Sequence, residues 1–140
     1  MTLPAALLPI TNDPISAPHW AAAHEGRLAM QRCDTCSYVR WPAARVCPEC
    51  LADGGTWATL SGRGTIWSYA VYVEPLHPAF AGQTPYAVGL IQLDEGPMLY
   101  GRLENDPATL ACDQRVVATF IELAPGVNIP RFRLEPTDDV

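Results

Sequence analysis

The sequence predicts a mainly β protein, and three features lead to this fold class. Runs rich in β-branched and aromatic residues fill the second half of the chain, with glycine and proline between them. A helix start signal and a helix stop signal flank one short segment near the N-terminus. Two Cys-x-x-Cys pairs lie between these regions. We therefore expect a helix, a small cysteine-rich unit and then a β domain.

Composition limits the possible classes of protein. The chain has 140 residues, of which 49% are hydrophobic and 17% charged, so it can bury a core. The net charge is −6, without the basic field that attracts phosphate backbones, which disfavours a nucleic-acid partner. No apolar run approaches the roughly 20 residues that span a bilayer. No signal-peptide pattern precedes the cysteines, and we expect a reduced, cytoplasmic protein.

The N-terminal part, residues 1–32, is expected to hold an arm and a helix. The first fifteen residues contain three prolines and no sustained period, which indicates an extended arm. Ser16 is a plausible N-cap, and Gly26 is a stop signal for the helix that follows. Alternation around Leu28 and Met30 then predicts a short strand before the first cysteine.

The β domain, residues 58–135, is expected to contain five strands. A loop over 74–85, a tight hairpin turn over 94–97 and a helical turn over 105–110 interrupt them, and a tail, 136–140, follows. We place the strands at 59–73, 86–93, 98–103, 115–123 and 129–134.

Five strands with one helical interruption are typical of a partly open Greek-key barrel of the OB type. The first predicted strand is long enough to bend around such a barrel. Gly62 and Gly64 are its candidate bulge or kink positions. A five-stranded sandwich is the alternative architecture.

The segment 33–57 carries the metal-ligand pattern Cys33-x-x-Cys36 and Cys47-x-x-Cys50. Each pair supplies one edge of a tetrahedron, and the ten residues between them can form a ribbon hairpin. One structural Zn²⁺ ion is the favoured interpretation over disulfides or buried thiols, and an iron site of the rubredoxin kind is the rival. Four thiolates leave no open position for catalysis at the metal.

Other reactive side chains form no recognisable catalytic set. Cys112 has no cysteine or histidine near it in sequence, so we interpret it as a buried or incidental thiol. The histidines, His19, His24 and His77, show no nucleophile or base arrangement with a serine or with that thiol.

Six segments in order resemble one family. They are His19 to Leu28, the two cysteine pairs, Ser61-Gly-Arg-Gly-Thr65, His77-Pro-Ala-Phe80, Pro85-Tyr86 and Ile129-Pro-Arg-Phe132. Together they resemble the DUF35 family of zinc-ribbon OB-fold proteins. The resemblance implies an N-terminal helix, a rubredoxin-like zinc ribbon and a C-terminal OB barrel. It departs from the family where Ser37 and Leu51 replace knuckle glycines, and where 111–113 replaces a glycine-containing turn.

The resemblance also implies a function. Members of the family resemble accessory subunits of thiolase-like enzymes, including thiolases and steroid side-chain aldolases, and some accompany MaoC-type enoyl-CoA hydratases. A non-catalytic subunit that assembles with a thiolase-fold enzyme and completes its CoA-thioester site is thus the leading hypothesis. A hydratase partner, a nucleic-acid-binding OB module and a rubredoxin-like electron carrier are the alternatives.

Four residues in or beside the ribbon are candidates for binding CoA. Arginine is suited to phosphate, and tryptophan to stacking on adenine. The candidates are Arg32, Arg40, Trp41 and Arg45. The other interpretation is that the arginines are solvated and that the tryptophan caps the ribbon or fills a partner interface.

Overall fold

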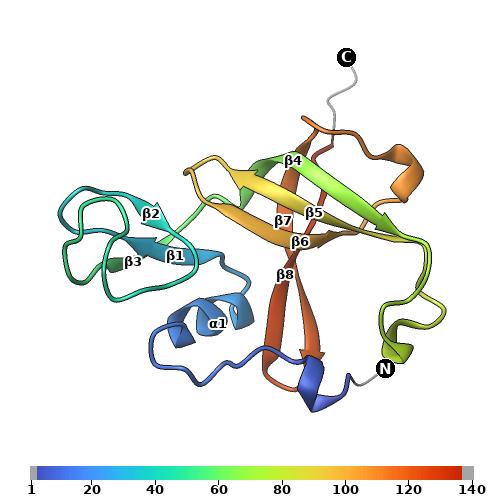
Figure 1. Ribbon diagram of the computed structural model, residues 1–140, viewed down its shortest axis with the longest axis horizontal. Helices are drawn as coiled ribbons and strands as arrows, with labels where there is room; N and C mark the ends of the chain where they lie inside the picture. Colours follow the sequence, from blue (N-terminus) through green and yellow to red (C-terminus); the bar gives the residue numbers. More distant parts are fainter. Residues whose placement is uncertain (1–2, 137–140) are drawn as a thin grey trace.

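The computed structural model describes residues 3–136 and has one helix, a small sheet and a barrel (Figure 1). The small sheet has the strand order β2-β1-β3, and the barrel is closed in the order β4-β5-β6-β8-β7. The expected helix, ribbon and five-stranded OB barrel are thus confirmed, and the closed barrel excludes the sandwich. The elements are α1 (Ala17–His24), β1 (Ala29–Arg32), β2 (Val39–Arg40), β3 (Thr56–Thr59), β4 (Arg63–Tyr72), β5 (Tyr86–Leu93), β6 (Met98–Leu103), β7 (Arg115–Ala124) and β8 (Val127–Leu134).

Helix α1 begins and ends at the predicted residues. Ser16 occupies the N-cap position, although its hydroxyl donates to the Asp13 carboxylate at 3.2 Å and caps no backbone N–H. Gly26 has a φ of 78°, in the left-handed region that ends helices. The arm before α1 contains one 3₁₀ turn, η1 (Ala5–Leu7). Residues 1–2 of the arm, and 137–140 of the expected tail, lie outside the described residues.

The predicted first strand, 59–73, is wrong at its start, because Thr59 is the last residue of β3 and β4 begins only at Arg63. β3 belongs to the small sheet, where Thr59 pairs with Ala29 of β1. Gly62 has a φ of 76° and lies in the turn between the two strands. The bulge is at neither predicted glycine, because the register of β4 against β5 shifts between Ile66 and Ser68.

The remaining barrel elements follow the sequence closely. β5 and β6 have the predicted bounds, while β7 and β8 are longer than predicted by one and two residues and pair through most of their lengths. The predicted hairpin turn is present, where the N–H of Gly96 donates to the carbonyl of Leu93 at 2.9 Å. The predicted helical turn is η3 (Pro107–Thr109), and the loop over 74–85 contains η2 (Pro78–Phe80).

The barrel closes at two seams. β4 pairs with β7 through three residue pairs, while β6 meets β8 in parallel through the single pair Leu103 and Phe132. Both side chains of that pair are buried in the core. The β6–β8 seam therefore holds the barrel closed mainly through side-chain packing.

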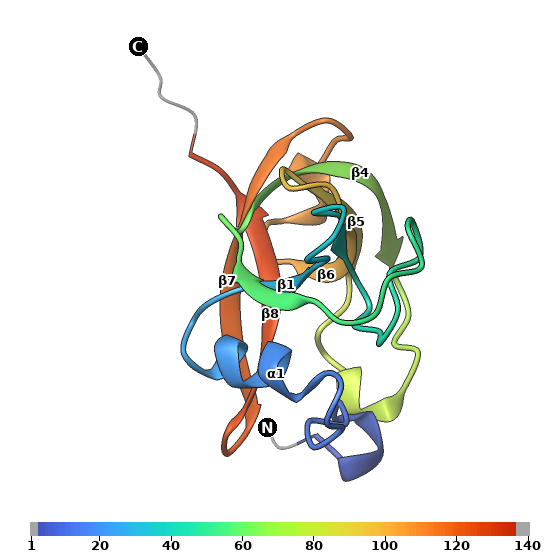
Figure 2. The same ribbon diagram turned by 90° about the vertical axis from the view of Figure 1, so that its left-hand side faces the viewer.

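The small sheet and the barrel share one hydrophobic core. Leu28, Met30 and Val39 belong to the same buried cluster as Ile66 and Phe132 of the barrel. Helix α1 contacts β1 on one side and β8 on the other, and Figures 1 and 2 show it below the ribbon and beside the β7–β8 hairpin. Within residues 3–136, neither α1 nor any 3₁₀ turn has the length and apolar character needed to cross a bilayer.

Candidate metal centre and outer-face cavity

The four predicted ligands lie together at one end of the ribbon. Their sulfur atoms are all within 4.8 Å of one another. The Cys33 and Cys50 sulfurs are 3.6 Å apart, as are those of Cys36 and Cys47. Zn–S bonds of about 2.3 Å in a tetrahedron require S–S separations of about 3.8 Å. The cluster therefore has the dimensions of a four-thiolate metal site.

The acid–base properties of the thiols also fit a cation. The backbone N–H groups of Cys36 and Thr35 point at the Cys33 sulfur and lower the pKa of that thiol to about 6. The Tyr38 N–H lowers the pKa of Cys36, but desolvation and the neighbouring sulfurs outweigh it and raise that pKa to about 12. The four groups cannot all be thiolates at neutral pH unless a cation compensates their charge.

The two knuckles keep a backbone that usually requires glycine. Ser37 and Leu51 have φ values of 67° and 64°. Their N–H groups donate to the Cys33 and Cys47 carbonyls at 3.0 and 2.9 Å. Asp113, in the segment without the expected glycine, has a φ of 72°. The departures from glycine thus leave the turns in place, and the backbones of these three residues adopt the left-handed conformation.

Of the four candidates for CoA binding, Arg40 is buried, with 2% of its surface exposed. Its Nε donates to the Gln31 side chain at 2.9 Å, and its Nη2 donates to the carbonyls of Ala44 and Gly54, both at 2.9 Å. These bonds connect β1 with the segment after β2 and with the segment before β3. Arg40 therefore serves the ribbon, and its remaining nitrogen, Nη1, is shielded from solvent and has no hydrogen-bond partner among the described residues.

The other three candidates do not form one site with it. Arg32 is exposed, and it lies on the sheet face opposite Arg40, because Arg40 pairs with the preceding residue, Gln31. Arg45 is exposed on the loop between the cysteine pairs. Trp41 is half-buried and packs on His19, with 4.1 Å between ring centroids. Trp41 thus packs against α1 through His19.

His19 has a structural position. It is 1% exposed, and its Nδ1 lies 2.8 Å from the Ala29 carbonyl, to which the N–H form donates. Burial lowers its pKa, and the bond to that carbonyl opposes the shift. The ring links α1 to β1 and to Trp41. Cys112, by contrast, is exposed, so it is the incidental thiol of the two predicted alternatives.

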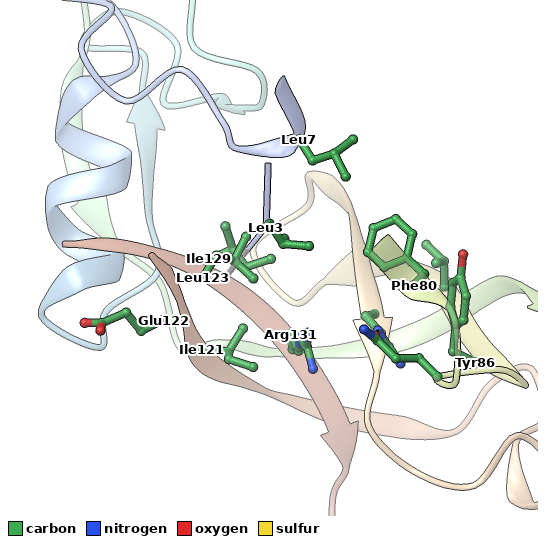
Figure 3. A pocket seen from close by; sticks show the side chains of 12 residues that line it. Leu3, Leu7, Phe80, Tyr86, Ile121, Glu122, Leu123, Ile129 and Arg131 are labelled. Carbon is green, nitrogen blue, oxygen red and sulfur yellow. Dashed lines mark hydrogen bonds between the residues drawn. The ribbon is translucent and has the colours of Figure 1, made fainter. Parts of the chain in front are cut away.

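A cavity that the sequence reasoning missed lies on the outer face of the barrel (Figure 3). Its volume is about 580 Å³. The arm covers one side with Leu3 and Leu7, and strands β5 to β8 form its floor. Two arginines, Arg102 of β6 and Arg131 of β8, are its cationic groups. They are 29 positions apart in the sequence, so only the pairing of β6 with β8 could have revealed their proximity.

Comparisons with known proteins match both parts of the chain. The family described as "ChsH2, rubredoxin-like zinc ribbon domain" matches residues 20–54. The family described as "ChsH2, C-terminal OB-fold domain" matches residues 57–120. Together with the sulfur geometry, the first match supports one structural zinc ion held by Cys33, Cys36, Cys47 and Cys50.

Curated relatives include subunits of acyl-CoA enzymes. The chain is 35% identical over 113 residues to a probable enoyl-CoA hydratase alpha subunit of Thermomonospora curvata, covering 80% of this chain and 35% of the relative. It is 32% identical over 92 residues to the benzoylsuccinyl-CoA thiolase subunit BbsA of Thauera aromatica, covering 63% of this chain and 59% of BbsA. The chain therefore spans less than two thirds of either relative.

A solved structure extends the likeness to nearly the whole fold. The chain matches the "Ltp2-ChsH2(DUF35) aldolase" with a TM-score of 0.81 and 32% identity. The match covers 90% of this chain and 98% of the other. With the zinc ribbon and the OB barrel both present, the chain belongs to the DUF35 family.

Proposed function

We propose that this chain is a non-catalytic subunit that assembles with a thiolase-fold acyl-CoA enzyme and completes its CoA-thioester site. The observation that carries the proposal is the likeness to the Ltp2-ChsH2(DUF35) aldolase, at 32% identity over 98% of the matched chain. The thiolase subunit BbsA supports the same class of partner. The names benzoylsuccinyl-CoA thiolase and enoyl-CoA hydratase both specify CoA thioesters, which makes a CoA thioester the expected ligand of the complex.

The chemistry of the chain supports an accessory role. Its metal site has four sulfur ligands and thus no open position for a substrate. The Nδ1 atom of His24 is bound to Asn128 at 2.9 Å, and that of His77 accepts the N–H of Ala79 at 3.0 Å. With His19 buried, no histidine of residues 3–136 is placed beside a cysteine or serine as a general base.

The exposed apolar side chains support a partner surface. Trp67 on β4 is 60% exposed, and Val73 and Leu76 on the loop after β4 are 74% and 72% exposed. Tyr100 on β6 is 72% exposed. Exposed aromatic side chains such as Trp67 and Tyr100 are the kind of group that anchors protein interfaces. In the arm, Leu3 and Leu7 face the chain's own barrel, while Ile10 is 74% exposed and extends the available apolar surface.

Co-expression of the tagged chain with the neighbouring open reading frames, followed by purification on the tag, tests the proposal. We expect a thiolase-fold subunit to co-purify. Activity on CoA thioesters should require the mixture and be absent from this chain alone. Full activity of the partner alone, or turnover by this chain alone, would contradict the accessory role.

A MaoC-type hydratase is the second candidate partner. The likeness to an enoyl-CoA hydratase alpha subunit favours it, since that match covers 80% of this chain. The same purification distinguishes the two candidate partners when the purified complex is assayed. A hydratase complex would add water to an enoyl-CoA, whereas a thiolase or aldolase complex would cleave a carbon–carbon bond. Arg32 and Arg45, both exposed, stay candidate CoA contacts, and Arg32→Gln and Arg45→Gln in the assembled enzyme test them through KM.

A further inference from the structure

Two arginines lie side by side on the outer face of the barrel. The parallel pair Leu103 and Phe132 sets the register of β6 against β8, so the residues before them, Arg102 and Arg131, are neighbours. Leu103 and Phe132 point into the core. Since successive side chains of a strand alternate between faces, both arginines point outward on the same face.

These arginines meet in a largely apolar cavity of about 580 Å³. Val88, Ile121 and Ile129 are among its lining residues. Leu3 and Leu7 of the arm line it from another side (Figure 3). Nonpolar surroundings of this kind strengthen electrostatic interactions with any group that enters.

The Arg102 guanidinium is held in place. Its Nη1 donates to the Gln83 side chain at 2.6 Å, and its Cζ lies 4.6 Å from the centroid of the Tyr86 ring. Arg131 is less satisfied, because its Nε is shielded from solvent and has no hydrogen-bond partner in the described structure. One arginine is thus fixed and the other has an unused donor.

No carboxylate within residues 3–136 forms a salt bridge with either arginine. The Glu122 carboxylate lines the cavity but points away from Arg131 (Figure 3). Glu104 accepts a hydrogen bond from Thr119 at 2.7 Å. Burial, and then the charge of Arg102, lower the pKa of Arg131, while Glu104 opposes this shift. Two half-buried like charges that form no salt bridge are unfavourable as neighbours, and an anion placed between them would offset their repulsion.

We propose that this cavity binds an amphipathic anion, with a carboxylate or phosphate held between Arg102 and Arg131 and an apolar body packed against Leu3, Leu7 and Ile129. Both kinds of oxyanion accept paired N–H bonds from guanidinium groups. The phosphate source is a CoA thioester, an assignment that rests on the proposed function. The carboxylate source, an acidic acyl compound, does not depend on it.

Isothermal titration of the isolated chain with decanoate and, separately, with CoA tests the proposal. We expect at least one of them to bind, and the one that binds identifies carboxylate or phosphate as the anion. Arg131→Gln should weaken that binding about tenfold or more, the effect of losing a charged hydrogen bond. Arg133→Gln is the matched control, since Arg133 lies two residues along β8 on the same face and is exposed; it should bind as the wild type does.

Thermal melting separates a binding role from a structural one. Without ligand, Arg131→Gln should melt at or above the wild-type temperature, because it removes one of two unneutralised neighbouring charges. Failure of both ligands to bind the wild type, or undiminished binding by a folded Arg131→Gln variant, would overturn the proposal. Neither result depends on a partner enzyme, so the accessory role stands or fails separately.

Discussion

At the scale of single residues, Leu51 shows how a knuckle keeps its turn without glycine. Its φ is 64°, and its side chain is 76% exposed, so the leucine contributes little packing where it strains the backbone. A non-glycine residue with a φ in this region is strained by roughly 1–2 kcal/mol. Replacing it with glycine relieves that strain, but the greater entropy of glycine in the unfolded chain costs about 0.5–1 kcal/mol. The knuckle is therefore a position where stability can be gained.

We expect Leu51→Gly to raise the free energy of unfolding of the zinc-loaded protein by up to about 1 kcal/mol. Chemical denaturation with zinc present measures this difference. Leu76→Gly is the control, since Leu76 is 72% exposed on a loop and does not have a positive φ; it should be neutral or destabilising. A loss of stability in the Leu51 variant would show that the turn is not strained.

His19 leads to a prediction about pH. Because burial lowers its folded-state pKa below the ordinary value of 6.5, the unfolded chain takes up the proton first as the pH falls. The stability contributed by neutral His19 is fully present above about pH 6.5 and is lost as the pH falls through the lowered pKa. Thiolate protonation also occurs in acid, so a variant is needed to isolate the histidine.

His19→Asn should be less stable than the wild type at pH 7.5 but should lose less further stability between pH 7.5 and 5.5. Asparagine can still donate to the Ala29 carbonyl and has no titrating group there. Melting temperatures at both pH values, with zinc content checked, measure the change. At pH 7.5, His24→Asn, at an exposed position of the same helix, should destabilise the protein less than His19→Asn does. An equal loss of melting temperature between pH 7.5 and 5.5 in His19→Asn and in the wild type would show that His19 does not contribute to the pH dependence.

At the scale of elements, the metal ligands were predictable because their spacing is local. Each Cys-x-x-Cys pair closes within one turn, so no long-range information is needed to group them. The bounds of β5 and β6 were predictable for a similar reason, since both strands stand between clear turn signals. The start of the strand predicted at 59–73 was not, because Thr59 belongs to β3 through the pairing of β3 with β1 rather than through its own residue type.

The ribbon itself should depend on zinc. Cys47 is fully buried, and its sulfur lies 3.6 Å from that of Cys36. Cys47→Ser removes one of four ligands and leaves a buried hydroxyl, so we expect loss of the zinc equivalent and partial unfolding or insolubility. Elemental analysis and circular dichroism provide the measurements. Cys112→Ser, which changes an exposed thiol, should keep one zinc per chain and an unchanged melting temperature.

The candidate sites show the limit of sequence reasoning at this scale. Arg40 carries the same charge as Arg32 and Arg45, and only its pairing opposite Gln31 shows that it is a buried structural group. Likewise, Arg102 and Arg131 are ordinary strand residues until the β6–β8 register makes them neighbours. Sites made by strand pairing between distant segments require the three-dimensional topology.

At the scale of the whole molecule, the ribbon and the barrel behave as one body because their core is continuous. Met30 of β1 is completely buried and lies in the same cluster as Ile66, Leu93 and Phe132 of the barrel. α1 adds a second connection, since it contacts both β1 and β8. The zinc ion should therefore stabilise the barrel as well as the ribbon, because unfolding of either part disrupts the shared core and thereby releases the metal.

This continuity leads us to expect that Met30→Ala destabilises both parts together. Removing a buried methionine side chain typically costs about 2–5 kcal/mol, which includes the cavity left behind. Barrel unfolding followed by circular dichroism and zinc release followed by a chromogenic chelator should shift to the same lower temperature. Met98→Ala is the control: it lies on β6, only partly buried and outside that cluster, and should cost less. Zinc release well below an unchanged barrel transition would show instead that the two parts unfold independently.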